Sequence, residues 1–204
     1  TISSVSGDIS QISSILSALL FYMGVVIAGL FMHMSLTYIS ILKFFTNISL
    51  KHFFKSIGPV QLVAFSTSSS GATLPVTMKR CEKDLGVSEE ISSFVLPLGA
   101  TINMDGTALY QGVAAVFITQ AVGMDLTFAD QFTIVATAVL ASIGTAAVPG
   151  AGIIMLVIIL EAINVPSQGI ALILGVDRIL DMIRTTTNVT GDATIACAMD
   201  SLEK

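Results

Sequence analysis

The chain has 204 residues, of which 53% are hydrophobic and 11% are charged, and its net charge at pH 7 is −5. A soluble domain usually carries about a quarter of charged residues, so these charges are too few to cover a water-facing surface. The composition excludes a soluble globular domain and a disordered chain, and it predicts an integral membrane protein with several spans. Because there is no basic tract, nucleic acid is not an expected partner.

The N-terminal part contains one clear transmembrane segment. Residues 1–14 are polar and lack the basic region of a signal peptide, so a loop is expected there. The apolar run 15–42 would make a helix of roughly 42 Å, longer than the ~30 Å hydrocarbon core, and it predicts a tilted transmembrane helix over 15–45. His33, inside this run, is expected to face other helices and make a hydrogen bond rather than relay protons.

The rest of the chain, 51–200, consists of apolar arms too short to be ordinary spans. Two arms flank a Ser-rich tip at 66–71 and two flank a Gly-rich tip at 142–152, and each pair predicts a helical hairpin that enters and leaves by one membrane face. Each hairpin is followed by an apolar segment with a polar interruption, at 103–106 and at 188–192. Both interruptions are expected to break a helix.

The basic residues predict opposite orientations for the two hairpins. Six of the nine Lys and Arg residues flank the first hairpin: Lys43, Lys51, Lys55, Lys79, Arg80 and Lys83. By the positive-inside rule both ends of this hairpin are cytoplasmic, whereas the loops 123–130 and 161–168 around the second contain no Lys or Arg. Paired interrupted segments of opposite orientation indicate an inverted-repeat transporter whose site lies where the repeats meet.

Polar residues recur along the last segment with helical spacing. They are Asp177, Asp181, Arg184, Asn188 and Asp192, with Thr185 at the border. At about 100° per residue they lie within about 80° of one another, on one helix face. Charges at membrane depth are costly unless paired, and they usually line a pathway. The alternative is a self-satisfied network in which Asp181 pairs with Arg184, but one arginine cannot neutralise all of these groups.

The residue types suggest what the site binds. Arg184 offers a planar fork that suits a carboxylate, Asp181 beside it suits an ammonium, and hairpin tips present N–H groups to a second carboxylate. Asn103, Asp105 and Asp192 are hard oxygen ligands with no thiol or imidazole nearby in the sequence, which favours an alkali or alkaline-earth cation. Together these groups describe an acidic amino acid that is co-transported with sodium, without a further cofactor.

Four motifs, at 68–75, 103–110, 142–152 and 177–192, carry a family resemblance. The chain closely resembles the C-terminal part of the sodium-coupled glutamate/aspartate transporters (sodium:dicarboxylate symporter family), and the likeness covers 15–197. It implies an all-α membrane protein with transmembrane helices, two re-entrant helical hairpins of opposite orientation, broken helices and an inverted repeat.

The resemblance also assigns the segments. It makes 15–45 the sixth helix of the family, 51–122 the first hairpin with a broken seventh helix, and 127–200 the second hairpin with the eighth helix. These form most of a mobile, elevator-type transport domain, and the scaffold half through which the family forms homotrimers is not among these residues. The implied location is the inner or plasma membrane, spanning the lipid bilayer several times, with a cytoplasmic C-terminus.

By the same resemblance, the substrate would contact Ser70, Thr107, Val148, Gly152, Asp181, Arg184, Thr185 and Asn188. One sodium ion would be held by the backbone carbonyls of Gly99, Asn103 and Asn188 and the side chain of Asp192. A second would lie among Thr101, Met104 and the carbonyls of Ser142, Ile143 and Thr145. A third would use Asn103 and Asp105 together with helix residues outside this chain.

Two departures from the family pattern bear on this assignment. Ser68 and Met182 stand where members often carry a second arginine, so substrate affinity or release would differ unless Arg178 substitutes. Gln111 stands where proton-coupled members carry a glutamate, which argues against proton coupling.

Other functions remain open at this point. A C4-dicarboxylate or neutral amino acid:cation symporter and an anion channel share most of these features. An intramembrane hydrolase would use Asp105 and Asp192 as a dyad or Ser70 as a nucleophile, but neither histidine, His33 nor His52, is placed to activate a serine. We therefore do not expect an enzyme.

Overall fold

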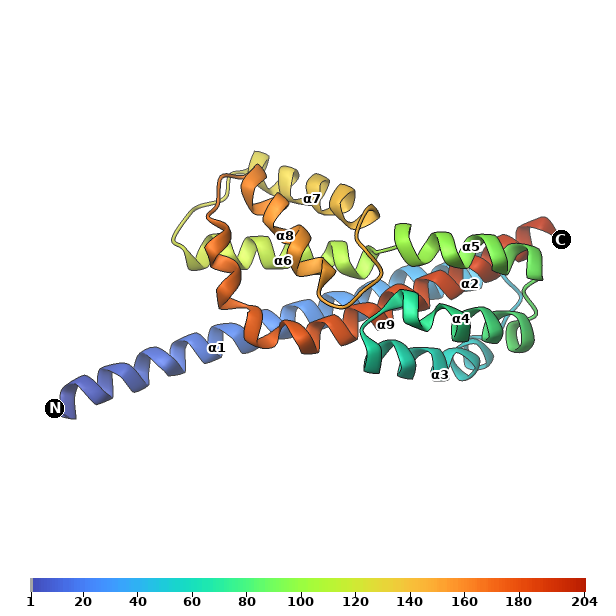
Figure 1. Cartoon of the computed structure of the whole chain (residues 1–204), viewed down its shortest axis with the longest axis horizontal. Helices are drawn as coiled ribbons and strands as arrows, with labels where there is room; N and C mark the ends of the chain where they lie inside the picture. The colour runs from blue at the N-terminus through green and yellow to red at the C-terminus, as the bar shows by residue number, and fades with distance from the viewer. Residues whose placement is uncertain (1) are drawn as a thin grey trace.

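The computed structural model describes the backbone of residues 2–204 and the side chains of residues 13–204. Its elements, in chain order, are α1 (Ile2–His33), a π-helical turn (Met34–Tyr38), α2 (Ile39–Phe45), α3 (Leu50–Thr67), α4 (Ser70–Leu85), α5 (Glu89–Ile102), α6 (Asp105–Ala121), α7 (Phe128–Ile143), α8 (Ala151–Ala162), a 3₁₀ turn (Ser167–Leu172) and α9 (Leu174–Glu203) (Figure 1). The described residues contain no strand, and the predicted all-α class is confirmed.

The first elements, α1, the π-helical turn and α2, follow one another without a loop. Residues 13–45 form the one helix, within the described part of the chain, that is long and apolar enough to cross a membrane. The loop expected at 1–14 is wrong from Ile2 onward, where α1 begins, and Thr1 lies outside the described residues. Extending a nucleated helix adds a hydrogen bond per residue, and Ser costs only about 0.5 kcal/mol relative to Ala, so the helix continues through this polar segment.

The first hairpin consists of α3 and α4, joined by a short turn at Ser68 and Ser69. Ser68 adopts the left-handed conformation, with φ 53°. Ser69 caps α4, because its hydroxyl accepts a hydrogen bond from the Ala72 N–H (3.1 Å). Each arm continues through an internal proline, Pro59 or Pro75, which leaves one carbonyl of the preceding turn without its helical partner.

The second hairpin consists of α7 and α8, and its tip is longer and less regular. Residues 144–150 contain no helix. The tip ends at Gly150, whose φ of 76° is a conformation in which a side chain would be strained. α7 itself begins with a capping box, in which Thr127 and Asp130 bond to each other's backbone.

The two hairpins point toward each other from opposite ends of the long axis, and their tips lie near its middle (Figure 1). They also touch directly. The Ser69 hydroxyl (2.6 Å) and the Gly71 N–H (3.2 Å) both donate to the backbone carbonyl of Ala147 in the second tip. The expected approach of the two tips is therefore observed.

The segments that follow the hairpins differ from each other. Asn103 and Met104 separate α5 from α6, so the expected break at 103–106 is confirmed. The break expected at 188–192 is wrong, because α9 is continuous from Leu174 to Glu203. This helix contains no proline, and within 188–192 the one glycine, Gly191, costs only about 1 kcal/mol. The side chains of Asn188 and Asp192 bond to the segment between α5 and α6 instead of to freed carbonyls.

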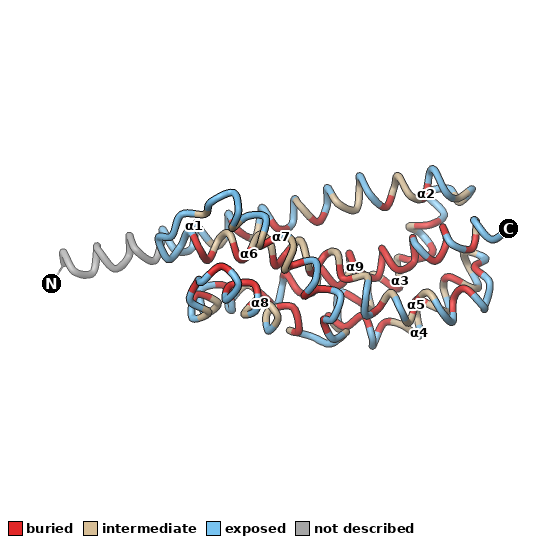
Figure 2. Tube along the Cα trace, turned by 90° about the horizontal axis from the view of Figure 1, so that it is seen from above, coloured by how far each residue is buried: buried red, intermediate tan, exposed pale blue. Residues whose placement is uncertain are grey.

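The apolar interior is divided into two clusters that α9 connects. One packs α1, α6, α7 and α8 around residues such as Val26, Ile118 and Leu156, and it reaches α9 at Leu180. The other packs α2 to α5 and reaches α9 at Val189. The polar stretch 181–188 lies between them, and Figure 2 shows α9 buried along much of its length.

The close approach of α6 to α9 gives a test of this packing. A Cβ at Gly106 would lie 2.7 Å from Asn188 Oδ1 and 2.9 Å from the backbone oxygen of Arg184, whereas a Cβ at Gly112 in the same helix meets nothing within 4 Å. We expect Gly106→Ala to lower the free energy of unfolding by about 1–3 kcal/mol through overpacking. Gly112→Ala should raise it by about 0.5–1 kcal/mol.

The measurement is thermal unfolding in detergent, followed by a thiol-reactive dye that reports exposure of the buried Cys81 and Cys197. Equal unfolding temperatures for the two variants would contradict the described helix contact.

Candidate functional site

All of the residues expected to contact substrate line one small cavity between the two tips, the start of α6 and α9. They are Ser70, Thr107, Val148, Gly152, Asp181, Arg184, Thr185 and Asn188. The cavity measures about 20 Å³, which is room for a single water. The cavity is therefore too small for an amino acid, and a substrate would fit only if one of the tips moved.

Arg184 is the centre of the cavity and is 1% exposed. Its Nε donates to Asp181 Oδ1 (3.0 Å) and its Nη1 donates to Asp177 Oδ1 (3.2 Å). Its Cζ lies 4.0 Å from the ring centroid of Tyr110, whose hydroxyl also donates to Asp177 (2.6 Å). The self-paired network that the sequence left as an alternative is thus present, and Asp177 enlarges it.

One nitrogen of Arg184 keeps donor capacity toward the cavity. Nη2 lies 2.9 Å from Asp181 Oδ1 as an ion pair but makes no hydrogen bond of good geometry among the described residues. A Cβ at Gly152 would lie 3.0 Å from Nη2, so this nitrogen faces the second hairpin. A guanidinium N–H in this position can receive a carboxylate oxygen without rebuilding the whole network.

Asp181 connects α9 to the second tip. Its Oδ1 accepts from Arg184, and its Oδ2 accepts from the Gly150 N–H (2.9 Å). Gly150 is the N-cap of α8, so the positive end of that helix points at the carboxylate. A carboxylate has about four acceptor positions, and two of them are used here.

Asn188 connects the cavity to the break between α5 and α6. Its Nδ2 donates to Thr107 Oγ1 (3.1 Å) and lies 3.2 Å from the Met104 sulfur, and its Oδ1 accepts from the Gly106 N–H (2.8 Å). The Asn188 side chain therefore contacts both Thr107, an expected substrate residue, and Met104, an expected sodium ligand.

Thr185, next to Arg184, is buried on the same face of α9.

The ligands expected for the first sodium ion are only partly together. Asn103 Nδ2 donates to Asp192 Oδ1 (2.9 Å), and a Cβ at Gly99 would lie 2.7 Å from the same oxygen. These three residues therefore meet. The backbone carbonyl of Asn188 lies inside continuous α9, where the helical hydrogen-bond ladder uses it.

The ligands expected for the second ion are more scattered. Met104 and Thr145 both line the small cavity. Ser142 is buried, but Thr101 and Ile143 are exposed, and the Thr101 hydroxyl donates to its own helix at Leu98 O (3.0 Å).

Asp105, expected at the third ion, already has partners. Its Oδ2 accepts from His33 Nε2 (2.6 Å) and from the Tyr38 hydroxyl (2.5 Å). The expected hydrogen bond of His33 is thus observed, but the expectation that no imidazole lies near these ligands is wrong, because α1 packs against α6. No three His, Cys, Asp or Glu side chains converge as a metal site among the described residues, so a cation would also need amide or backbone oxygens.

Several contributing residues were not found from the sequence. Tyr110 stands beneath Arg184, and Gln111 donates from Nε2 to the Gly152 carbonyl (2.9 Å), which ties α6 to the second hairpin. Tyr110 ends the motif 103–110 and Gln111 follows it, and their position one turn after Thr107 in α6 is the signal that could have identified these contacts. Tyr38 has no such signal, since it lies in the apolar run of the first helix.

A larger cavity lies elsewhere, between α1, α6 and α7. It measures about 880 Å³, its lining is mainly apolar, with Phe21, Phe117 and Val135 among the residues, and it contains no basic side chain. A carboxylate would find no positive partner there. The small polar cavity is therefore the better candidate for an anionic ligand.

Two hairpin tips that close over a buried charged cluster characterise a membrane transporter, which must enclose its solute between the two sides. The chain belongs to the sodium:dicarboxylate symporter family, whose model matches residues 2–202. Its members are transporters and not enzymes, which removes the hydrolase alternative, and membership implies an integral membrane protein.

Curated relatives support the same family. The chain is 43% identical over 187 residues to an excitatory amino acid transporter of Caenorhabditis elegans, covering 91% of this chain and 37% of that protein. It is 50% identical over 143 residues to excitatory amino acid transporter 1 of Rattus norvegicus, covering 70% of this chain and 26% of that protein. It is 46% identical over 185 residues to excitatory amino acid transporter 3 of Mus musculus, covering 90% of this chain and 35% of that protein. The chain thus spans about a quarter to just over a third of the length of these relatives.

The contact between the tips can be tested at Ser69. Ser69→Ala removes the hydrogen bond to the Ala147 carbonyl and the cap of α4, and loss of such a cap costs about 0.5–2 kcal/mol. We expect faster backbone hydrogen exchange over residues 144–150. Ser66→Ala is the matched control, because that hydroxyl bonds only to carbonyls of its own helix. Unchanged exchange at the tip in Ser69→Ala would show that this contact does not hold the second hairpin.

Proposed function

We propose that this chain forms the substrate- and sodium-binding part of a secondary active transporter that carries an acidic amino acid together with sodium by an elevator-type movement. The observation that carries the proposal is the small polar cavity, lined by all eight residues expected to contact substrate, around the buried Arg184. The family and the excitatory amino acid transporters among its relatives support the same substrate class.

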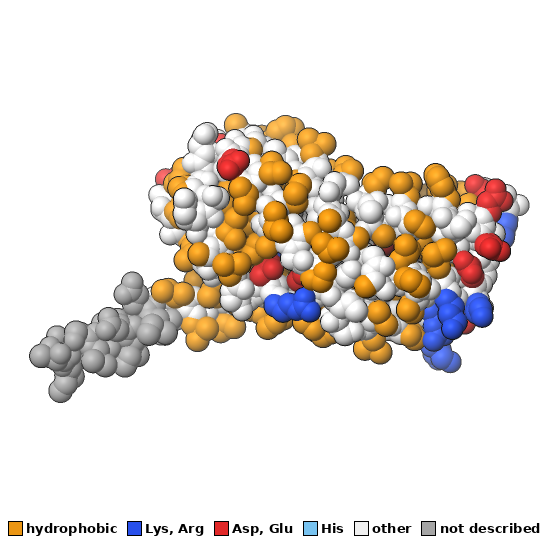
Figure 3. Space-filling view, viewed as in Figure 1, with side chains coloured by type: hydrophobic (Ala, Val, Ile, Leu, Met, Phe, Trp, Pro, Cys, Tyr) orange, Lys and Arg blue, Asp and Glu red, His pale blue; other side chains and the backbone are white. Residues whose placement is uncertain are grey.

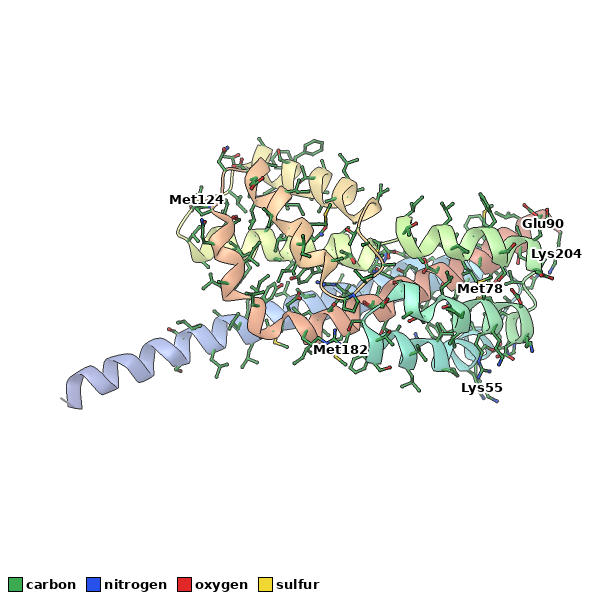
Figure 4. All side chains as sticks on the ribbon, in the orientation of Figure 1. Lys55, Met78, Glu90, Met124, Met182 and Lys204 are labelled. Carbon is green, nitrogen blue, oxygen red and sulfur yellow. The ribbon has the colours of Figure 1, made fainter. Side chains whose placement is uncertain are left out.

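The arrangement in the membrane follows from polarity. The outer surface of α1 and α2 carries exposed large apolar side chains, such as Leu20, Phe31 and Phe44, and hydrophobic side chains spread over much of the face in Figure 3. Basic side chains gather at one end of that face. Figure 4 places Lys55 and Lys204 at that end and Met124 at the other. We assign the basic end, with the C-terminus, to the cytoplasm.

With this orientation the two hairpins are re-entrant from opposite faces. The first, with α5 and α6 (51–122), enters from the cytoplasm, and the second, with α9 (127–200), enters from outside, as an inverted repeat requires. The segment 15–45 spans the membrane beside them. The scaffold that would assemble a homotrimer belongs to sequence that the relatives have and this chain does not cover.

Substrate recognition rests on complementary charges. Arg184 Nη2 would receive the side-chain carboxylate, and Asp181 would receive the amine through its remaining acceptor positions. The N-termini of α4 and α8, which meet at this cavity, would present N–H groups to the second carboxylate. Because the cavity is too small for the substrate, a tip must move to admit it, and the second hairpin, with its irregular tip, acts as the gate.

Sodium would bind beside this cavity, where Asn103, Asp105 and Asp192 provide oxygen ligands and the second tip provides carbonyls near Ser142 and Thr145. An ion bound between the tip and the break at 103–104 stabilises the closed gate. By linkage, sodium then tightens substrate binding and substrate tightens sodium binding by the same factor.

A C4-dicarboxylate symporter is the closest alternative. The position of Asp181 next to Arg184 argues against it, because a substrate without an ammonium would place further carboxylates against a buried acid. A neutral amino acid symporter is a further alternative, but its substrate has no side-chain carboxylate to pair with the Arg184 guanidinium.

The central test is calorimetric binding of aspartate and succinate to the full-length protein that carries this chain. We expect aspartate affinity to fall at least tenfold, about 1.4 kcal/mol, when choline replaces sodium, and succinate to bind far more weakly than aspartate. Equal aspartate affinity in choline and in sodium would refute the coupling. Equal affinity for succinate and aspartate would favour the dicarboxylate alternative, and the anion-channel alternative predicts no uptake against a gradient.

The role of Arg184 is tested by Arg184→Ala, with Arg178→Ala as the matched control on the exposed face of the same helix. Loss of the buried fork should weaken aspartate binding by about 2–5 kcal/mol and admit neutral amino acids. Arg178→Ala should bind aspartate normally. If Arg184→Ala binds aspartate within about threefold of the parent protein, the assignment is wrong.

A further inference from the structure

The π-helical turn of the first helix carries two donors to one carboxylate oxygen. His33 Nε2 lies 2.6 Å and the Tyr38 hydroxyl 2.5 Å from Asp105 Oδ2. An ionised carboxylate can only accept, so both groups donate. The Thr37 hydroxyl lies 3.3 Å from His33 Nδ1, and the rings of His33 and Tyr38 pack edge to face at 4.9 Å.

The helix type explains how both side chains reach the same atom. Positions five apart in an α-helix lie about 140° from each other at about 100° per residue, so they could not share a partner. In a π turn, which closes with i→i+5 bonds, such positions come nearly one above the other. The π turn Met34–Tyr38 therefore places Tyr38 on the face of His33, toward α6.

Tyr38 also reaches the neighbouring ligand group. A Cβ at Gly191 would lie 2.6 Å from the Tyr38 hydroxyl and 2.8 Å from Asn103 Nδ2, which itself donates to Asp192. The Tyr38 hydroxyl, 2% exposed as a residue, therefore lies between Asp105 and the Asn103–Asp192 pair. Asp105 Oδ1 accepts only from the adjacent Gly106 N–H (2.9 Å), so it retains acceptor capacity.

We infer that Tyr38 and His33 are positioning residues for the sodium site, an inference that rests on the proposed function. By occupying Oδ2, they fix the rotation of the Asp105 carboxylate and leave Oδ1 to ligate the ion singly. A carboxylate that loses one of them is held less firmly, and sodium affinity would fall although the ligand itself is still present.

The matched pair for the test is Tyr38→Phe and Tyr22→Phe. Each removes a buried hydroxyl from the same continuous helix, but the Tyr22 hydroxyl makes no hydrogen bond of good geometry among the described residues, and its neighbour is Tyr110 rather than Asp105. The readout is the rise in unfolding temperature of the full-length protein with sodium alone, choline keeping ionic strength constant. We expect the sodium concentration for half of the maximal rise to increase about tenfold in Tyr38→Phe and to stay unchanged in Tyr22→Phe.

His33 gives an independent arm if Tyr38→Phe fails to fold. His33→Gln keeps an N–H donor at a similar reach and should retain the sodium midpoint, whereas His33→Leu should raise it.

The outcomes separate the two ideas. A parent protein whose unfolding temperature does not respond to sodium overturns the proposed function and this inference with it. A responding parent protein in which Tyr38→Phe matches Tyr22→Phe, or His33→Leu matches His33→Gln, overturns the inference alone. A lower maximal uptake with an unchanged sodium midpoint also overturns it, since that result indicates a purely structural role.

Discussion

The burial of one guanidinium group constrains the centre of the molecule. Moving such a charge out of water costs several kcal/mol even after relaxation, so compensating groups must be held in fixed positions. Asp181 and Asp177 lie one and two turns earlier on the same helix as Arg184, and the Tyr110 ring comes from α6. The Gly150 N–H joins the second hairpin to Asp181, one of these two acids. The register between α6 and α9 and the position of the second hairpin therefore depend on the same charge.

The architecture could be predicted where its signals are local. Short apolar arms with Ser- or Gly-rich tips define the hairpins, and the break at Asn103 and Met104 follows from polar residues between two apolar arms. The same reasoning fails at 188–192, where the polar composition is similar but the helix is unbroken. A polar motif does not predict whether the helix will break, so that backbone groups make the polar contacts, or stay intact, so that side chains make them. In α9 the side chains carry them, because Asn188 and Asp192 find partners on the segment around the break.

The membership of the site could be predicted, and of its pairing only the Asp181–Arg184 contact was foreseen, as an alternative. Helical spacing places Asp181, Arg184 and Asn188 on one face, and the cavity contains them all. Which acid pairs with Arg184 depends on rotamers and on the ring of Tyr110, which leave no trace in spacing. The hydrogen bond of His33 follows from the cost of burying a polar ring, but its partner lies 72 positions away. The contact of Tyr38 with Asp105 could not be predicted, because it depends on a π turn. Nothing in the composition of this apolar helix indicates where such a turn occurs.

The contacts of the second tip hold it against the first hairpin, α6 and α9. Four hydrogen bonds hold it: two converge on the Ala147 carbonyl, one joins Gly150 to Asp181, and one joins Gln111 to Gly152. At about 1 kcal/mol net for each, these four bonds contribute about 4 kcal/mol to holding the tip against the facing elements. On the second hairpin all four bonds use backbone atoms, so none of them depends on a side chain of that hairpin. The side chains that make three of them, Ser69, Gln111 and Asp181, belong to three other parts of the fold, and a substitution at any of these loosens the tip without changing its own sequence.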